Sequence, residues 1–450
     1  MHTLQQLKSG VLSSTEPAIT RLQLAENLTQ FPCEIFDLAD SLEVLDLSGN
    51  KLSSLPADFG RLKHLRILFL SNNQFDHLPE VLSDCPKLEM IGFKANHITT
   101  VAEDALPVQT RWLILTDNEI EKLPDSMGQL YRLQKLALAG NKLTELPSSM
   151  ANCRNLELAR LSANSLTALP DWLFQLPKMS WLAFAGNAFN KNVCDAPMIK
   201  ANMASIQLNH QIGEGASGVI HHANWVKQPA SLKGVDAEIA VKLFKGAVTS
   251  DGYPQDELNC CLTAGEHPNL IKVVAKIEQK NQLGLVMKLI PGTFYNLGLP
   301  PSLVSCTRDT FNEGTTFTPE QITKIAFSMA DILAHLHGKQ VSHGDVYAHN
   351  TMIDDQASVL FGDFGAASDL SVLPQIQREA MESVEVRAFA CLLEDLLGLN
   401  SEQYDSSLIS ALTDLKNTCM HEDTVFRPRL NEVKNKLQSL LVQPELEFLF

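Results

Sequence analysis

The sequence predicts an α/β solenoid of short repeats followed by an α+β globular domain that contains candidate catalytic residues. Within the first 200 residues, eight asparagines recur at steps of 22 or 23 residues, which indicates a repeat architecture. Beyond residue 205 this repeat is absent, and strand-like stretches interrupted by glycines are followed by longer patterns of helical period. At 450 residues the chain is long enough for each part to have its own core.

Each unit of the repeat has a strand pattern that ends at the recurring asparagine, as in Leu42-x-x-Leu45-x-Leu47-x-x-Asn50. The asparagines are Asn27, Asn50, Asn73, Asn96, Asn118, Asn141, Asn164 and Asn187. A Leu-Pro or Phe-Pro pair follows most of them. This pattern resembles the leucine-rich repeat family, which implies a solenoid with its caps over residues 1–200. The leucines of each strand would point inward, where only stacked neighbours can bury them.

The asparagine at each turn is expected to bond backbone groups that the curve of the chain leaves unpaired. A buried group without a partner would cost about 1–3 kcal/mol. The unit around Val101-Ala102 lacks its proline, and the next unit begins with Thr110 where leucine is expected. We therefore expect a local irregularity in the solenoid between these positions.

One column of strand residues is expected to face solvent on the concave side of the solenoid, yet six of its eight members are apolar. These six residues, the concave stripe, are Val44, Ile67, Met90, Trp112, Leu158 and Trp181. A solvated sheet face normally alternates to polar residues, so a contiguous stripe predicts a binding surface for a protein partner. That partner could be another protein, a peptide or the chain's own second domain. The alternative interpretation is that these residues are scattered apolar side chains on the surface, which are common and have no binding role.

The stretch His343–Asn350 reads H-G-D-V-Y-A-H-N and lies between two short apolar runs. It contains Asp345 and, five residues later, Asn350; Asp363 follows thirteen residues further on, in G-D-F-G. Two acids and an amide at this spacing suit phosphoryl transfer. Asp345 can orient an attacking hydroxyl, while Asn350 and Asp363 hold Mg²⁺ against the phosphates of a nucleotide.

These motifs resemble the eukaryotic-like protein kinase family, and the resemblance implies a bilobal protein-kinase-like domain of the α+β class over residues 205–443. The usual H-R-D of the family is H-G-D here, because Gly344 stands in place of the arginine. H-G-D also occurs in aminoglycoside and choline kinases, which share the fold. The motif therefore supports a phosphotransferase more firmly than it supports a protein kinase.

The resemblance also implies which residues bind ATP. Lys242, in I-A-V-K, lies at a strand position after a glycine loop and would contact the α- and β-phosphates. Glu257 would hold this lysine, with Asp256 as the reserve. The nucleotide-binding residues are expected to be Ile212, Gly213, Gly215, Gly218, Ile220, Ala240, Lys242, Met287 and Leu289.

Several positions depart from the family pattern. Tyr347 stands where serine/threonine kinases carry a lysine, and His349 stands where tyrosine kinases carry an arginine. A protonated His349 could supply a cation to the transferring phosphoryl group, so we count it among the catalytic residues. In the expected central helix, Glu385 replaces an aspartate. Gly344 removes the arginine that would bind an activation-loop phosphate, and the segment after Asp363 is short, so we expect no activation by phosphorylation.

The composition excludes several classes of function. The formal net charge is −16, so the chain offers no broad basic surface, and we expect no binding to nucleic acid or to anionic membranes. The nine cysteines are odd in number and include no C-x-x-C pair, which predicts reduced thiols in a cytoplasmic protein. No run of 18 apolar residues occurs, so we expect no membrane-spanning segment.

We therefore expect an ATP-dependent protein kinase of the serine/threonine type that phosphorylates a protein hydroxyl and uses its repeats to recruit a substrate or regulator. Two alternatives stay open. A small-molecule phosphotransferase similar to aminoglycoside and choline kinases is favoured by H-G-D and by the short segment after Asp363. In a pseudokinase scaffold, the repeats would bind the partner and nucleotide would gate the second domain.

Overall fold

The computed structural model describes residues 2–190, 198–215, 217–232, 236–246, 248–249, 251–279, 282–401 and 407–442. The chain divides into two compact units. The first comprises Met1–Lys178 and Asn187–Phe189, and the second comprises Met179–Gly186 and Asn190–Phe450. The expected domain end at residue 443 lies outside the described residues.

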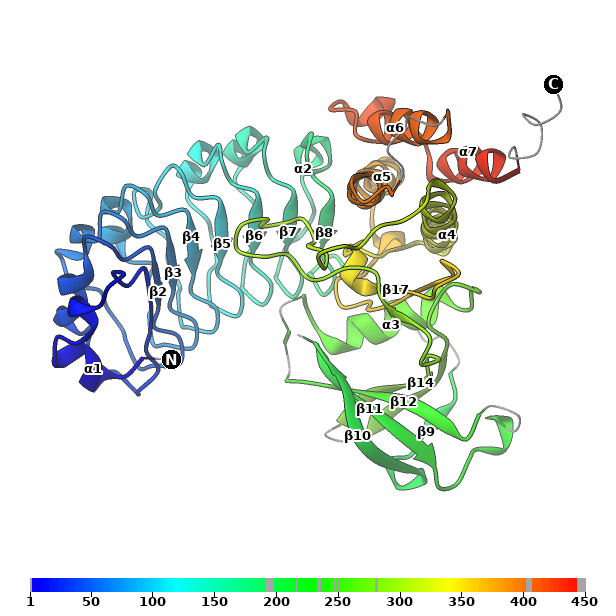
Figure 1. Ribbon diagram of the computed structural model, residues 1–450, viewed down its shortest axis with the longest axis horizontal. Coiled ribbons are helices and arrows are strands. Elements are labelled where there is room, and N and C mark those ends of the chain that lie inside the picture. The colour runs from blue at the N-terminus through cyan, green and yellow to red at the C-terminus, as the bar shows by residue number, and fades with distance from the viewer. Residues whose placement is uncertain are drawn as a thin grey trace. The chain divides into compact units, whose positions relative to one another are not determined.

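The first unit is built from short parallel strands that follow one another at the repeat interval (Figure 1). Each strand pairs in register with the next, so equivalent residues of successive repeats form ladders. The strands are β1 (Arg21–Gln23), β2 (Val44–Asp46), β3 (Ile67–Phe69), β4 (Met90–Gly92), β5 (Trp112–Ile114), β6 (Lys135–Ala137) and β7 (Leu158–Arg160). The helices of this unit are α1 (Leu4–Lys8), η1 (Leu12–Ser14), η2 (Cys33–Leu38), η3 (Phe59–Arg61), η4 (Glu80–Asp84), η5 (Asp125–Gln129), η6 (Ser148–Asn152) and α2 (Asp171–Gln175).

The middle residue of each strand is buried inside the solenoid, as the period-two pattern predicts. Leu45 and Leu68 are fully buried, and Leu113 occupies the same position in β5. Because these strands pair in register, the buried side chains of successive repeats stack on one another. The predicted repeat architecture is therefore confirmed in this unit.

The recurring asparagines join successive repeats through buried hydrogen bonds. The Asn73 amide nitrogen donates to the carbonyl oxygens of Leu47, at 3.0 Å, and Leu70, at 3.1 Å. Its amide oxygen accepts from the Leu52 backbone N–H at 2.9 Å. The same pattern recurs at Asn96, Asn118, Asn141 and Asn164. The predicted role of these side chains is confirmed, since each one meets backbone groups of two neighbouring repeats.

The predicted irregularity near Thr110 is also confirmed. Within the described chain, no helical turn lies between β4 and β5, although one lies between most other neighbouring strands. Thr110 is fully buried where other units carry leucine, and its hydroxyl donates to the Pro107 carbonyl oxygen at 2.7 Å. A buried hydroxyl needs a partner, and the local turn supplies it.

The concave stripe is less exposed than the sequence predicts. Val44 and Trp112 are half-buried, and the ammonium of Lys135 lies 4.3 Å from the centre of the Trp112 ring. The other four members are buried: Ile67, Met90, Leu158 and Trp181. In the ladder, Met90 lies between Ile67 and Trp112, and side chains at the spacing of neighbouring strands cover one another. The prediction of a continuous exposed stripe is therefore wrong.

The second unit contains a six-stranded sheet in the order β10-β11-β12-β14-β13-β9. Its neighbours are antiparallel, except that β9 runs parallel to β13. The strands are β9 (Lys200–Ala201), β10 (Ile206–Glu214), β11 (Gly218–Trp225), β12 (Glu238–Phe244), β13 (Val273–Gln279) and β14 (Gln282–Lys288). Val241, Ile277 and Val286 lie in the buried core of the sheet. Helix α3 (Pro254–Ala264) packs through Leu258 and Leu262 against Leu285 of β14.

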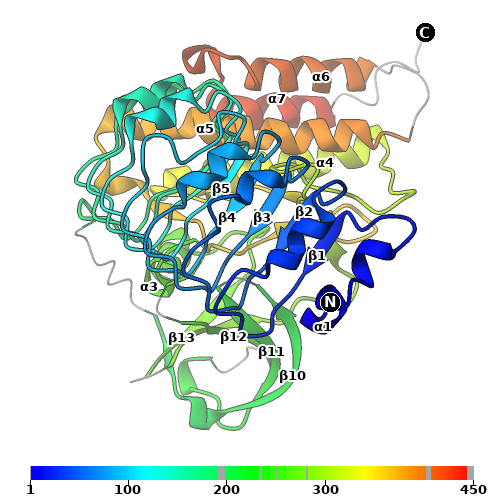
Figure 2. The same ribbon diagram turned by 90° about the vertical axis from the view of Figure 1, so that its left-hand side faces the viewer.

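The longer helices gather on the side of this unit opposite the sheet, as Figures 1 and 2 show. They are α4 (Pro319–Gly338), α5 (Gln375–Gly398), α6 (Ser407–Cys419) and α7 (Leu430–Val442), with shorter turns at η7 (Met203–Ser205), η8 (Ala230–Leu232), η10 (Leu370–Val372) and η11 (Thr424–Phe426). Thr318 and Gln321 form a capping box that begins α4. Among the described residues, no helix is both long and apolar enough to cross a bilayer.

Two small ladders position the loops that carry the predicted site. Strand β17 (Thr351–Ile353) pairs with β15 (Tyr295–Asn296) and β18 (Val359–Phe361), while β16 (Val341–Ser342) pairs with β19 (Ser368–Asp369). The loop with Asp345 and the turn η9 (Ala348–Asn350) runs from β16 to β17. The loop with Asp363 runs from β18 to β19. Because the strands at both ends of one loop pair with those of the other, the two loops begin and end side by side.

Candidate active site

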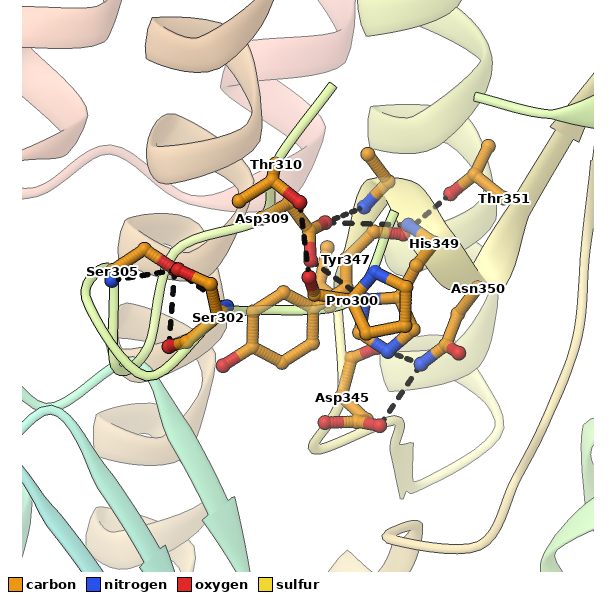
Figure 3. Close-up of polar contacts among 12 residues, drawn as sticks. Pro300, Ser302, Ser305, Asp309, Thr310, Asp345, Tyr347, His349, Asn350 and Thr351 are labelled. Carbon is orange, nitrogen blue, oxygen red and sulfur yellow. Dashed lines mark hydrogen bonds and ion pairs between the residues drawn. The ribbon is translucent and has the colours of Figure 1, made fainter. Parts of the chain in front are cut away.

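Asp345 and Asn350 are held together within the loop from β16 to β17. The Asn350 amide nitrogen donates to the Asp345 Oδ2 atom at 2.9 Å and to its carbonyl oxygen at 3.1 Å (Figure 3). An asparagine side chain has one donor group and one acceptor oxygen. Because the donor group is committed to Asp345, the amide oxygen is the atom of Asn350 suited to accept a bond or bind a cation.

Lys242, on β12, contacts two acidic residues, one on helix α3 and one in the loop from β18 to β19. Its Nζ atom donates to Glu257 Oε1 on α3 and lies 3.2 Å from Asp363 Oδ1. The side chains of Lys242 and Glu257 are both buried. Glu257, rather than Asp256, is therefore the residue of α3 that reaches the lysine.

Burial and charge act in opposite directions on this cluster. Burial tends to lower the pKa of Lys242, but the carboxylates of Asp363 and Glu257 outweigh it and raise that pKa. Burial raises the pKa of Glu257, against the opposing effect of Lys242. Partial removal from water tends to raise the pKa of Asp363, but the charge of the Lys242 ammonium outweighs this effect and holds that pKa below its usual value. The site therefore keeps a fixed positive charge beside an ionised carboxylate.

Asp363 has a left-handed backbone conformation, with φ of 60°, which is uncommon for a residue other than glycine. Its side chain is 47% exposed, while Lys242 beside it is buried. The preceding Gly362 passes close to Ile271, where a Cβ atom on the glycine would lie 2.5 Å from the Ile271 Cδ1 atom. Backbone strain of this kind clusters at functional sites. Here it presents a carboxylate to Lys242 and leaves part of that carboxylate accessible.

The glycine-rich turn connects β10 and β11, in the strand–turn–strand arrangement that the sequence predicts. The Gly215 N–H donates to the Gly218 carbonyl oxygen at 2.9 Å, which closes the turn. A Cβ atom on Gly218 would lie 2.7 Å from the Leu243 carbonyl oxygen, so a larger residue cannot pass β12 this closely. A Cβ atom on Gly215 would meet nothing within 4 Å. The turn therefore has open space on one side.

The other predicted nucleotide contacts lie on the strands that adjoin this turn. Gly213 pairs with Ile220, and Ala240 pairs with Met287 across β12 and β14. Ala240 is buried, Met287 is half-buried, and Ile212 is exposed on β10. The sheet thus brings residues from four strands to the neighbourhood of Lys242.

A cavity of about 930 Å³ lies beside Leu289, and His267 and Phe294 also line it. Neither Lys242 nor Asp363 is among its lining residues. The cavity is therefore distinct from the cluster around Lys242, and among the predicted nucleotide contacts it is Leu289 that borders it.

Asp309, a residue that the sequence pattern does not single out, pins the loop that carries Asp345. Its carboxylate accepts from the backbone N–H groups of Ala348, at 2.5 Å, and His349, at 3.2 Å. It also pairs with His349 Nδ1 at 2.7 Å (Figure 3). The Asp309 side chain is only 1% exposed. A segment some 40 residues earlier in the chain thus fixes both the backbone and a side chain of the loop.

The contact with Asp309 also controls the charge of His349. Burial lowers the pKa of His349, but the hydrogen bond and negative charge of Asp309, with added effects of Asp345 and Asp363, outweigh burial and raise that pKa. The imidazole is therefore biased toward its protonated form, with Nδ1–H donating to the carboxylate. The contact with Asp309 therefore supports the prediction that His349, next to Asn350, is a cation.

Arg308 anchors the segment that carries Asp309 to helix α5. Its guanidinium donates to Glu394 Oε2 at 2.7 Å, to Asp395 Oδ1 at 2.5 Å and to the Cys391 carbonyl oxygen at 2.8 Å. The feature of the sequence that could have drawn attention to Asp309 is the adjacent pair Arg308-Asp309 inside a long loop. A charged pair alone does not reveal its contacts, so only the folded arrangement identifies Asp309 as a functional candidate.

Glu385 and His343 support the other end of the same loop. Glu385 on α5 is fully buried, pairs with His337 Nε2 and accepts from the Gly344 N–H at 2.7 Å. His343 Nε2 bonds the Gly362 carbonyl oxygen at 3.0 Å. Burial lowers the pKa of His343, which favours its neutral form. Both residues therefore hold backbone in place, and neither is placed as an acid or base.

The donor set of the site fits Mg²⁺ and a nucleotide triphosphate. The Asn350 amide oxygen and the Asp363 carboxylate are hard oxygen donors, which Mg²⁺ prefers and for which it requires few protein ligands when phosphates complete its shell. Lys242 offers a positive charge beside Asp363, as a phosphate group requires. The half-exposed Asp363 carboxylate is accessible to such a cation.

Comparison with known protein families agrees with this geometry. Residues 206–392 match the family model described as protein tyrosine and serine/threonine kinase. Residues 17–75 and 40–98 match the leucine rich repeat model. The two matches fall on the unit that contains Lys242 and Asp345 and on the unit that contains the parallel ladders.

Individual relatives resemble part of this chain. An L-type lectin-domain containing receptor kinase V.7 of Arabidopsis thaliana is 32% identical over 178 residues, which are 38% of this chain and 24% of that protein. An L-type lectin-domain containing receptor kinase IX.2 of the same plant is 28% identical over 167 residues, 35% of this chain and 22% of that protein. A probable serine/threonine-protein kinase of Dictyostelium discoideum is 21% identical over 281 residues, 54% of this chain and 28% of that protein. The chain thus spans about a quarter of the length of these relatives.

Proposed function

For a chain that joins leucine-rich repeats to a protein kinase domain, we propose the activity of an ATP-dependent protein kinase that transfers the γ-phosphoryl group to a protein hydroxyl. The observation that carries this proposal is the bridge from Lys242 to Glu257 and Asp363, next to the loop in which Asn350 bonds Asp345. We assign residues 1–200 to the repeat region with its caps and 205–443 to a bilobal kinase domain.

In this mechanism Asp345 orients the hydroxyl of the acceptor and takes up its proton. Its bond to Asn350 restricts the carboxylate, so little reorganisation is needed at the moment of transfer. Asn350 and Asp363 are the residues that would hold the metal. When bound, Mg²⁺ offsets the charge of the phosphate oxygens.

Lys242 positions the phosphates of ATP, and Glu257 keeps its ammonium in place. The glycine turn covers the phosphates, because Gly215 has open space beside it and Gly218 allows the strands to approach closely. The adenine would lie against Ile212, Ile220, Ala240, Met287 and Leu289, which supply apolar contact. Binding of this kind lowers the barrier by orientation, since the protein does little covalent chemistry in phosphoryl transfer.

His349 supplies a further positive charge near the transferring group. Its raised pKa, caused by Asp309, supports the protonated form at neutral pH. This charge would stand in for the lysine that serine/threonine kinases carry at the position of Tyr347. The serine/threonine type of acceptor is favoured by the similarity to the probable serine/threonine-protein kinase of Dictyostelium discoideum.

The repeats would recruit the protein that is phosphorylated or one that regulates the kinase. Val44 and Trp112 are the members of the concave stripe that remain half-exposed, so they are the anchors available for a partner. Large aromatic side chains dominate many protein interfaces because they exclude much water at a small cost in side-chain entropy.

A transfer assay with the purified chain tests this proposal. The protein is incubated with Mg²⁺, ATP labelled on the γ-phosphate, and either casein or a cell lysate, and the label is followed into protein and into small molecules. We expect labelled protein with wild type and with Asp354→Asn, a matched change on a surface turn, but none with Asp345→Asn. Label in small molecules alone would indicate the small-molecule phosphotransferase. Nucleotide binding without transfer to either fraction would indicate the pseudokinase scaffold.

A further inference from the structure

The eighth repeat strand, β8 (Trp181–Ala183), belongs to the second unit rather than the first. In sequence it continues the repeat series, and Asn187 closes its pattern at the usual interval. In the fold, the segment Met179–Gly186 is grouped with the kinase domain, and β8 packs against α5. A strand that is repeat by sequence is thus part of the kinase domain by packing.

Trp181 makes two specific contacts with the loop that carries Asp345. Its ring stacks on the Tyr347 ring, with centroids 4.6 Å apart and planes within 7° of parallel. Its indole N–H donates to the Val346 carbonyl oxygen at 3.0 Å. The Trp181 side chain is fully buried, so neither contact competes with water. Both contacts fall on the two residues that directly follow Asp345.

The backbone of the segment Met179–Gly186 reaches the two loops of the site. At Gly344, which has φ of 72°, a Cβ atom would lie 3.0 Å from the Leu182 carbonyl oxygen and 2.5 Å from that of Ala366. The Phe184 N–H donates to the buried Ser368 hydroxyl at 3.0 Å. A residue with a side chain in place of Gly344 would collide with both backbones. The glycine in H-G-D is therefore the residue that allows β8 to lie against this loop.

The turn after β8 contacts helix α3. A Cβ atom on Gly186 would lie 2.6 Å from Asp256 Oδ2 and 2.6 Å from the Tyr253 ring. Asp256 is the neighbour of Glu257, which holds Lys242. The short segment from Trp181 to Gly186 thus meets both elements that must be in place around the nucleotide.

We propose that the eighth repeat is a positioning element of the kinase site, in which Trp181 holds the loop of Asp345 and the Gly186 turn holds helix α3. This proposal rests on the proposed kinase function for its effect on rate, but its effect on structure can be measured separately. In this arrangement the backbone of β8 lies against Gly344, the position at which the family usually carries an arginine.

Substitution of Trp181 in the full chain tests the effect on rate. In Trp181→Leu the stacked pair and the indole hydrogen bond are lost, and we expect kcat to fall about tenfold, equivalent to about 1.4 kcal/mol, with KM for ATP within about twofold of wild type. Trp181→Phe retains a ring on Tyr347, so it should recover most of the loss. A kcat of Trp181→Leu equal to that of wild type, or an equal loss in both variants, would overturn the proposal.

A pair of glycine substitutions tests the contact with α3 even if Trp181→Leu does not fold. Gly49 occupies the equivalent turn of the second repeat, with φ of 74° against 73° at Gly186, but a Cβ atom there meets nothing within 4 Å. Ala95 and Ala163 occupy this turn position in other repeats, so alanine is compatible with the backbone. We expect Gly186→Ala to lower kcat at least threefold and Gly49→Ala to leave it unchanged. Equal rates for the two variants would refute the role of this turn.

Hydrogen exchange distinguishes failure of this proposal from failure of the kinase function. In wild type the amides of residues 341–351 and 254–264 should exchange slowly. Trp181→Leu should speed exchange in the first range and Gly186→Ala in the second, whereas Gly49→Ala should do neither. If transfer is absent but these changes appear, the kinase function is wrong and the positioning role stands. If exchange in both ranges is unchanged, the positioning role is wrong whatever the activity.

Discussion

Replacing Asp309 by asparagine should destabilise the protein in a manner that depends on pH. The substitution keeps an oxygen that can accept from the Ala348 N–H but removes the negative charge that faces His349 Nδ1 at 2.7 Å. A hydrogen bond between charged groups contributes about 1.5–3 kcal/mol. Since the hydrogen bond and charge of Asp309 raise the pKa of His349 against the effect of burial, that pKa should fall in Asp309→Asn.

The direction of the pH dependence follows from the raised pKa of His349. A group whose pKa is higher in the folded state stabilises that state fully below its unfolded pKa, about 6.5 for histidine. That contribution disappears as the pH rises through the folded pKa. The difference in unfolding free energy between wild type and Asp309→Asn should therefore be about 1.5–3 kcal/mol at pH 6 and should shrink at pH 9.

Urea unfolding at a series of pH values, without nucleotide or divalent metal, measures this difference, and an NMR titration of His349 measures its pKa. Asp354→Asn is the matched control, because Asp354 accepts from the backbone N–H groups of Gln356 and Ser358 but contacts no histidine in the described bonds. The control should show no change in its penalty between pH 6 and 9. A penalty for Asp309→Asn that is equal at both pH values, or an unchanged pKa of His349, would refute the reasoning.

Three further outcomes are expected. Mg²⁺·ATP should raise the melting temperature of wild type, since a ligand that binds the native state stabilises it. In Asp363→Ala the part of this rise that depends on Mg²⁺ should be lost. Equal rises with and without Mg²⁺ in both proteins would count against the metal assignment. Because Gly344 leaves no arginine to bind an activation phosphate, phosphatase treatment should not change the initial rate of transfer; a loss that returns after autophosphorylation would contradict this. Trp112→Ala should weaken capture of a protein target in a pull-down by about ten- to a hundredfold, because about 1.5–3 kcal/mol of apolar burial is lost. The melting temperature of this variant should not fall. A lower melting temperature would show that Trp112 belongs to the core.

The features that were predictable from the sequence depend on local spacing. The repeat could be identified because the asparagines recur at a fixed sequence distance from their bonding partners. Asn73, for example, bonds Leu70 in its own repeat and Leu47 in the preceding repeat. The pairing of Lys242 with Glu257 was predictable because family motifs bracket both residues. In each case the relevant contact is determined by a short stretch of chain and a known element type.

The features that were not predictable depend on contacts between distant segments. The period-two pattern shows that Trp181 points away from the leucines, but it does not show that Tyr347 covers the ring. The same pattern does not show how much of the Met90 side chain is buried by its neighbours in the ladder. The exposure of the concave stripe was overestimated for this reason. Asp309 lies in a loop without periodicity, and its partners are known only once that loop is anchored by Arg308.

The asparagine ladder determines how the solenoid can gain or lose length. Each asparagine of a regular repeat bonds the carbonyl three residues before it and an equivalent carbonyl 26 residues before it, as Asn164 does with Leu161 and Leu138. At Asn118, which follows the irregular unit, the second interval is 25 residues. Deleting one whole regular repeat brings the next asparagine to an equivalent carbonyl, so every bond can form again. Inserting a few residues within a repeat shifts that partner out of reach. Recombination at the repeat interval is therefore a tolerated route to longer or shorter solenoids, whereas the repeat that contains Trp181 cannot be exchanged without replacing its partners on the loop.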